Sequence, residues 1–184
     1  MEFSMETNLF TDRSLWTMIH GIVFSGAALM ALAAAIFSLR MLHAGKASET
    51  VTKIQSRYMI SLTVFMAVML WLTVIVGTYI TFPPYRAMPP EGLTDLSMYP
   101  KAMLQANAST SWLHSFAMET KEHVPWIASI LATAVASISM QYRSLMIRDD
   151  KLNKLVTWVL GICLVLVSYA ALLGVFVNKV APLD

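Results

Sequence analysis

The sequence has few charged residues and a single cysteine, and these two shortages exclude several classes of protein. Only 13% of its 184 residues are charged, whereas about a quarter is usual in a soluble domain. Cys163 has no second cysteine to pair with, so we expect no disulfide framework within the chain. The Cys-x-x-Cys-His signature of covalently attached c-type haem is absent as well.

The usual signals of nucleotide and nucleic-acid binding are also missing. The net charge is only +2, no basic cluster stands beside interleaved aromatic residues, and no glycine-rich phosphate loop is present. We therefore expect no nucleic-acid partner. No Asp or Glu lies in the middle of an apolar run, which argues against a proton pump or transporter.

Long apolar runs dominate what is present. Hydrophobic residues make up 57% of the chain, and a membrane-spanning helix needs about 20 mostly apolar residues. Four runs qualify, at 15–39, 59–82, 124–140 and 155–177. The first is too long for the apolar part of a cleaved signal peptide, and we interpret it as a retained span. The pattern predicts an all-α fold, a single four-helix transmembrane bundle over 1–184, in contact with the lipid bilayer.

The distribution of Lys and Arg predicts the orientation of the bundle. Eight of the 13 basic residues lie in or beside the two short connections, and five are spread over the other side. The eight are Arg40, Lys46, Lys53, Arg57, Arg143, Arg148, Lys151 and Lys154. We therefore expect both termini and the central loop, 83–111, on the outer side, as a multi-pass protein of a bacterial inner membrane.

The third helix is predicted to extend beyond the outer membrane face. Asn107, Ser109 and Thr110 are good N-cap residues, and in the stretch 111–148 only Pro125 interrupts the helical pattern. Such a helix would exceed about 50 Å, at about 1.5 Å per residue, against a bilayer core of about 30 Å. Proline inside the helix removes one backbone hydrogen bond, so we expect a kink there.

Small residues are frequent where the helices are expected to touch, which lets membrane helices pack closely. They are Gly26, Ala27 and Ala31 on the first helix and Ala128, Ala132 and Ala136 on the third.

Two histidines near the outer side are the main candidates for chemistry. His20 lies about a turn and a half inside the first helix, and His123 stands at the entry of the third. A b-type haem in a helical bundle needs two axial imidazoles from facing helices, so we predict that this pair binds haem b. Residues expected to make room for the ring or to neutralise its propionates are Gly21, Gly77, Gly174, Arg86 and Lys179. His43, on the inner side, has no histidine to pair with.

The sequence also resembles known families, both in its four spans and in two short segments. These segments are Leu-Trp-Thr-Met-Ile-His-Gly at 15–21 and Met-Glu-Thr-Lys-Glu-His at 118–123. The layout resembles four-helix membrane cytochrome b subunits, which anchor respiratory complexes and exchange electrons with quinone. The two segments are similar to a bacterial four-span family without a characterised function. The resemblance implies an electron-transfer or anchor subunit with one haem, a quinone, and a cytochrome c or iron–sulfur protein as partner.

Two other readings stay open. Glu119 and His123 are four residues apart on one helix face, and with His20 or His114 they could bind a metal ion. Alternatively, the chain is a cofactor-free structural subunit that docks a larger complex through Tyr85, Met98, Trp112 and Phe116. On a plainer interpretation of the same cluster, Glu119, Lys121 and Glu122 form ion pairs at the membrane interface, with Arg86 or Lys179 as partners. Most of the fourteen methionines lie in apolar spans, so we discount copper.

Overall fold

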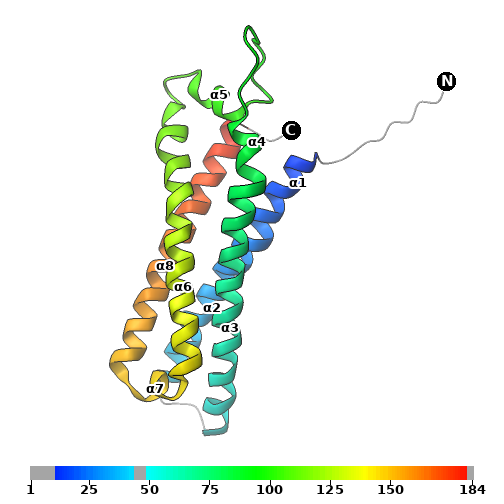
Figure 1. Cartoon of the computed structure of the whole chain (residues 1–184). Coiled ribbons are helices and arrows are strands. Elements are labelled where there is room, and N and C mark those ends of the chain that lie inside the picture. The colour runs from blue at the N-terminus through cyan, green and yellow to red at the C-terminus, as the bar shows by residue number, and fades with distance from the viewer. Residues whose placement is uncertain (1–10, 44–48, 182–184) are drawn as a thin grey trace, which may run out of the picture.

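The computed structural model describes residues 11–43 and 49–181, and every regular element in these ranges is helical (Figure 1). The elements are α1 (Asp12–Met18), η1 (Ile19–Ser25), α2 (Gly26–His43), α3 (Glu49–Val76), η2 (Gly77–Thr81), α4 (Phe82–Arg86), α5 (Pro100–Gln105), η3 (Leu113–Met118), α6 (Glu119–Gln141), α7 (Arg143–Arg148) and α8 (Asp150–Val180), where η marks a π-helical segment. The side chain of His43 lies outside the described part of the chain.

Four continuous helices are long and apolar enough to cross a membrane, as predicted. They are Asp12–Met41, Ser56–Arg86, Leu113–Gln141 and Asp150–Val180, of 30, 31, 29 and 31 residues. Each contains one of the four apolar runs of the sequence. The prediction of an all-α fold with four helices that could span a membrane is therefore confirmed.

The four helices form a ring in which α3 packs on α2 and α6, and α8 packs on the same two helices. Small side chains fill the positions where they meet: Ala31, Ala128, Ala132 and Ala136 are at most 5% exposed. Gly26 and Ala27, also expected in these contacts, are only half-buried, and Ala28 and Ala35 occupy the core instead. Small residues at these positions let the helix backbones approach closely, as the sequence predicts.

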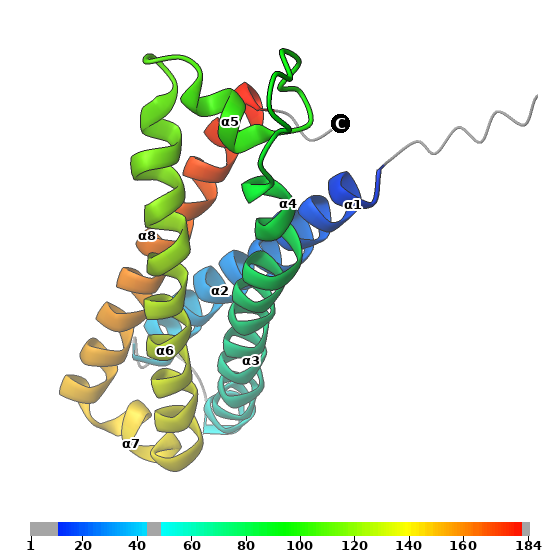
Figure 2. The ribbon, with the colours of Figure 1, turned by 45° about the horizontal axis from the view of Figure 1, so that its top comes forward.

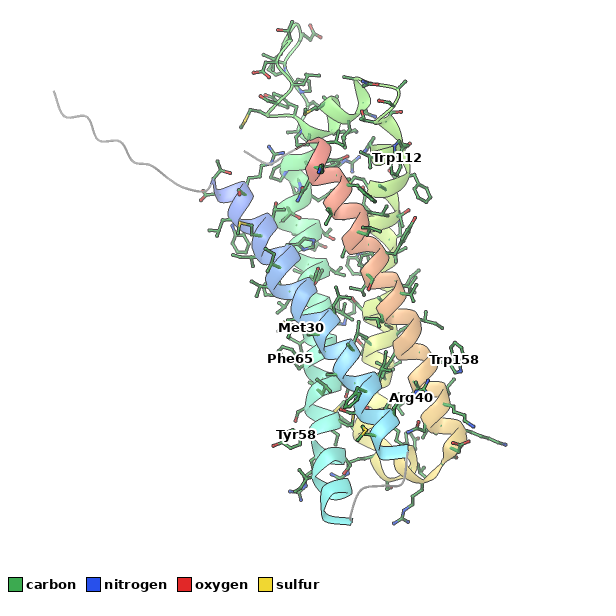
Figure 3. The ribbon with its side chains drawn as sticks, turned by 180° about the vertical axis from the view of Figure 1, so that it is seen from behind. Met30, Arg40, Tyr58, Phe65, Trp112 and Trp158 are labelled. Carbon is green, nitrogen blue, oxygen red and sulfur yellow. The ribbon has the colours of Figure 1, made fainter. Side chains whose placement is uncertain are left out.

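The outside of the bundle is apolar along its length. Met30 and Trp158 are 75% and 73% exposed, and Phe65 and Tyr58 also point outward (Figure 3). Soluble monomers rarely expose a continuous apolar surface of this extent. Contact with lipid accounts for this apolar surface, and the surface therefore supports a multi-pass membrane protein.

The third long helix ends earlier than predicted. It stops at Gln141, because Tyr142 leaves the helical conformation (φ −117°, ψ 29°), and α7 follows as a separate short helix. The expectation of one helix through residue 148 was wrong. Pro125 lies inside α6, as expected, and its missing N–H would otherwise bond the carbonyl of Lys121.

The end of the bundle at which the first long helix begins and the fourth ends differs from the rest in two ways. The sequence predicts that this end is the outer one, and we call it the outer end below. All three π-helical segments lie there, one in each of the first three long helices. A second apolar core caps this end, in which Tyr85, Leu104, Leu113 and Leu173 are at most 5% exposed. Above it, residues 87–99 form a loop that projects away from the bundle (Figures 1 and 2).

Candidate functional site

His20 is directed into the bundle from the π-helical segment η1. Its ring packs on Gly77, the first residue of η2: a β-carbon at position 77 would lie 2.8 Å from Cε1 of the imidazole. The Nδ1 atom is buried and has no hydrogen-bond partner within the described residues. The ring also contacts the backbone of Thr73, one turn before the glycine. A histidine at membrane depth with an unpaired ring nitrogen is costly unless something binds to it.

Lys121 is also directed inward, from the first turn of α6. Its amine packs on Gly174 of α8, where a β-carbon would lie 2.8 Å from Nζ. The amine is close enough to His20 for the two groups to interact electrostatically. Glycines on η2 and α8 thus make room for two basic side chains near the outer end of the bundle.

A second polar group lies further out, where α4 meets η3. The hydroxyl of Tyr85 and Nδ1 of His114 form a hydrogen bond of 3.0 Å, and their rings are 6.0 Å apart. Glu119, Glu122 and Arg86 interact electrostatically with the tyrosine. Since Tyr85 is only 5% exposed, this hydrogen bond fixes α4 against η3 beneath the outer loop.

The two predicted haem ligands are not brought together. His123 is exposed on the outside of α6, and its Nδ1 bonds the carbonyl of Glu119 one turn earlier, at 2.7 Å. It follows the inward-directed Lys121 by two residues, which turns it by about 200° on a helix of 3.6 residues per turn. His20, in contrast, faces the interior. This arrangement does not fit a haem ring held between the two imidazoles.

The other predicted cofactor contacts are also dispersed. Gly77 and Gly174 receive the side chains of His20 and Lys121, whereas Gly21 is exposed and a β-carbon there would meet nothing within 4 Å. Arg86 lies over the ring of Phe82, 5.3 Å from its centroid. Lys179 lines a shallow surface cavity of about 210 Å³ together with Trp112 and Phe176.

The alternative metal site and the expected ion pairs are not formed either. Within residues 11–43 and 49–181, no group of three His, Cys, Asp or Glu side chains could hold a metal ion. His20, His114, Glu119 and His123 therefore do not form one ligand set. Among the same residues, no ion pair is seen for Glu119, Lys121 or Glu122.

Comparisons of this chain with protein-family models, with curated proteins and with solved structures find no match. The resemblance to cytochrome b subunits therefore stays a prediction.

Proposed function

We propose that this chain is the membrane-anchor subunit of a larger complex and holds a partner protein at its outer face. The observation that carries the proposal is the loop 87–99, which projects beyond the four long helices (Figure 2). Met88, Leu93 and Met98 in this loop are 74%, 42% and 59% exposed. They lie outside the four long helices, where a docked partner would cover these apolar side chains.

The loop is held in one shape by several hydrogen bonds. The backbone N–H of Leu93 donates to the carbonyl of Pro90, and that of Tyr99 donates to the carbonyl of Leu96. Arg13, at the start of the first helix, donates to the carbonyl of Met98 at 3.4 Å. Because the loop is already ordered, it loses little conformational entropy when a partner binds. This property favours its use as a docking surface.

The charge of the loop favours a protein surface over an anionic lipid surface. Glu91 and Asp95 are both exposed near its tip. The backbone N–H of Ser97 donates to Asp95 at 3.0 Å, which holds the pKa of that carboxyl below its usual range. Two negative charges beside the exposed methionines are repelled by anionic headgroups, and fit a partner with apolar pockets bordered by Lys or Arg.

The proposal includes an orientation and a location. We place both termini and the loop 87–99 on the outer side of a bacterial inner membrane, with the start of the third helix extending past the outer membrane face. Support comes from the eight basic residues in or beside the two short connections. A cytochrome c or iron–sulfur protein of a respiratory complex is the kind of partner that the resemblance suggests. The proposal does not depend on haem.

Docking is tested by replacing Met88, Leu93 and Met98 together with serine in the native membranes. We expect the wild-type chain to migrate in a complex with a different protein on native gels, and the triple variant to migrate alone. Gln105→Ser, an exposed polar position on the adjoining α5, is the matched control and should keep the complex. A wild-type chain that migrates alone or only with copies of itself would overturn the proposal, as would a triple variant that keeps its partner.

Orientation is tested by cysteine labelling, because Cys163 is buried and gives little background. A membrane-impermeant maleimide should label Thr94→Cys in intact cells, and should label Ser144→Cys only after the membrane is opened. The reverse pattern would invert the orientation and place the loop on the inner side.

A further inference from the structure

A shallow cavity of about 210 Å³ lies between the start of the third long helix and the end of the fourth. Ser109, Thr110 and Trp112 line it from the segment that leads into η3, and Phe176 and Lys179 line it from the last turns of α8. The docking role of the loop 87–99 involves none of these residues. The cavity therefore needs an explanation of its own.

The lengths of the two helices place this cavity among the lipid headgroups. The third and fourth long helices have 29 and 31 residues, which makes each about 45 Å long at about 1.5 Å per residue. The hydrocarbon core of a bilayer is about 30 Å thick, and about 40–45 Å with its headgroup layers. Trp112, near the end of α8 in Figure 3, is of the residue type enriched at this level. The conclusion holds for either orientation of the bundle.

The polar part of the cavity offers one positive charge and two acceptor oxygens. Lys179 is exposed and forms no ion pair within the described residues. The hydroxyl of Ser109 donates to the side-chain carbonyl of Asn107 at 2.8 Å. The hydroxyl of Thr110 donates to the backbone carbonyl of Leu104 at 2.9 Å. Because a hydroxyl has a single hydrogen, both oxygens are left with lone pairs only.

The apolar part of the cavity continues toward the centre of the membrane. Phe176 is 45% exposed, and Leu172, four positions earlier on the same face of α8, is 50% exposed. On the other wall, Phe116 follows Trp112 by four positions and is 53% exposed. Since η3 packs on α8, these side chains form two apolar walls that begin at the cavity. Such walls suit the acyl chains of a lipid.

We propose that the cavity binds an anionic phospholipid with a hydroxylated headgroup, of the phosphatidylglycerol type. Its phosphodiester carries one negative charge, which Lys179 neutralises in a charge-assisted hydrogen bond. The glycerol hydroxyls donate to the oxygens of Ser109 and Thr110. Phosphatidylethanolamine is neutral overall and leaves the lysine charge uncompensated. This binding needs the membrane position of the bundle and does not depend on a docked partner.

The experiment titrates the purified full-length chain with phosphatidylglycerol and follows the bound mass by native mass spectrometry. We expect one tightly bound lipid per wild-type chain. Lys179→Met should bind it about tenfold more weakly, as expected for the loss of a charge-assisted hydrogen bond. Lys151→Met removes an exposed lysine at the opposite end of α8 and is the matched control, with unchanged affinity. A wild-type chain that retains no lipid, or an equal affinity of the two variants, would overturn the proposal.

Three further ligands separate the parts of the lipid. Phosphatidylethanolamine lacks the net charge, and phosphatidylmethanol keeps the charge without the headgroup hydroxyls. With the same acyl chains, the first should bind about tenfold and the second about fivefold more weakly than phosphatidylglycerol. Glycerophosphoglycerol, the headgroup without acyl chains, should not bind measurably. An affinity equal to that of phosphatidylglycerol for any of the three rejects the assignment, and for the last it would indicate a soluble phosphodiester ligand.

A pair of serine variants tests the acceptor oxygens and keeps the proposal falsifiable if Lys179→Met does not fold. Ser109→Ala removes an oxygen that lines the cavity. Ser111→Ala is the matched control, because its hydroxyl also donates to a carbonyl, that of Ala108 at 3.1 Å, and lies outside the lining. We expect Ser109→Ala to reduce the preference for phosphatidylglycerol over phosphatidylmethanol, and Ser111→Ala to keep it. The same preference in both variants would overturn the proposed headgroup contacts.

Discussion

The imidazole of His20 occupies the space that a side chain at position 77 would need. A β-carbon on Gly77 would lie 2.8 Å from Cε1 and 3.3 Å from Nδ1 of the ring. Contacts this short are not tolerated between packed atoms, so one of the two helices or the ring must shift. The glycine at the start of η2 therefore sets the position of the imidazole inside the bundle.

This relationship predicts that Gly77→Ala destabilises the protein by about 1–3 kcal/mol, the usual cost of inserting a methyl group into a packed core. Gly21→Ala is the matched control, because its β-carbon would meet nothing within 4 Å. The control should be neutral or slightly stabilising, since alanine is the better helix former. Unfolding of the purified protein in a denaturing detergent measures both.

The double variant His20→Ala, Gly77→Ala identifies the cause of the loss. If the ring is the obstacle, Gly77→Ala costs much less in the His20→Ala background than in the wild type. Equal costs in the two backgrounds would show that the glycine is needed for another reason, such as the backbone conformation of η2.

The hydrogen bond between Tyr85 and His114 should contribute to the stability of the outer cap. Tyr85→Phe removes the hydroxyl and leaves Nδ1 of His114 without its partner at 3.0 Å. We expect a loss of about 1 kcal/mol, the typical net value of such a bond, measured by thermal unfolding. His114→Ala should cancel most of this effect in the double variant, and a fully additive result would contradict the coupling.

The four-helix architecture could be predicted because it depends on the length of apolar runs alone. A run of about 20 apolar residues has few alternatives to a spanning helix, and all four were found. The end of α6 at Gln141 could not be predicted in this way, because residues 143–148 form a short helix of their own. Contacts with other helices position α7. Asn153 of the following α8 donates to the carbonyl of Met146 at 3.2 Å, and α7 also contacts α2 and α3.

The inward direction of Lys121 could have been predicted from helical periodicity, although it was not. Residues 7 and 11 positions later, Ala128 and Ala132, are fully buried, which places the lysine on the inner face. Ile127 and Ile130 follow His123 by four and seven positions and are 52% and 59% exposed. The small residues predicted at the helix contacts thus already distinguished the two faces.

The approach of Lys121 to Gly174 was beyond prediction from sequence. The two residues are 53 positions apart in the chain and belong to different helices. No local sequence pattern specifies which residues of two packed helices lie at the same depth. The same limit applies to His20 and His123, whose similar predicted depth suggested a haem. The depth of a residue in the membrane can be predicted by counting residues along its helix. Whether two side chains point toward each other also depends on the rotation of each helix about its axis and on π-helical turns.

A side-chain hydrogen bond joins α3 and α6 near the middle of the membrane-spanning region. Nε1 of Trp71 donates to Oγ1 of Thr133 at 2.9 Å, and the ring also makes an edge-to-face contact with Trp126, with centroids 5.7 Å apart. Trp71→Phe keeps an aromatic ring and removes the donor. We expect a loss of about 0.6 kcal/mol, the average for such bonds in membrane proteins.

Thr133→Val provides the matched control for this bond, because valine has nearly the shape of threonine and no hydroxyl. Each single variant and the double variant are compared by unfolding in a denaturing detergent. Apart from the cost of the smaller ring in Trp71→Phe, the double variant should lose no more free energy of unfolding than the more destabilised single variant. A double variant with the sum of both losses would mean that the two side chains stabilise the bundle independently.

The N-terminus of α8 depends on the carboxylate of Asp149. Its Oδ1 accepts hydrogen bonds from the backbone N–H groups of Lys151 and Leu152 at 2.8 and 3.2 Å. Asp149→Ala removes this cap and should cost about 0.5–2 kcal/mol in thermal unfolding. Asp149→Asn keeps an oxygen acceptor and should lose little, since asparagine is an equally good capping residue. If both variants lose the same stability, the negative charge near the helix N-terminus, and not the cap, would be the stabilising feature.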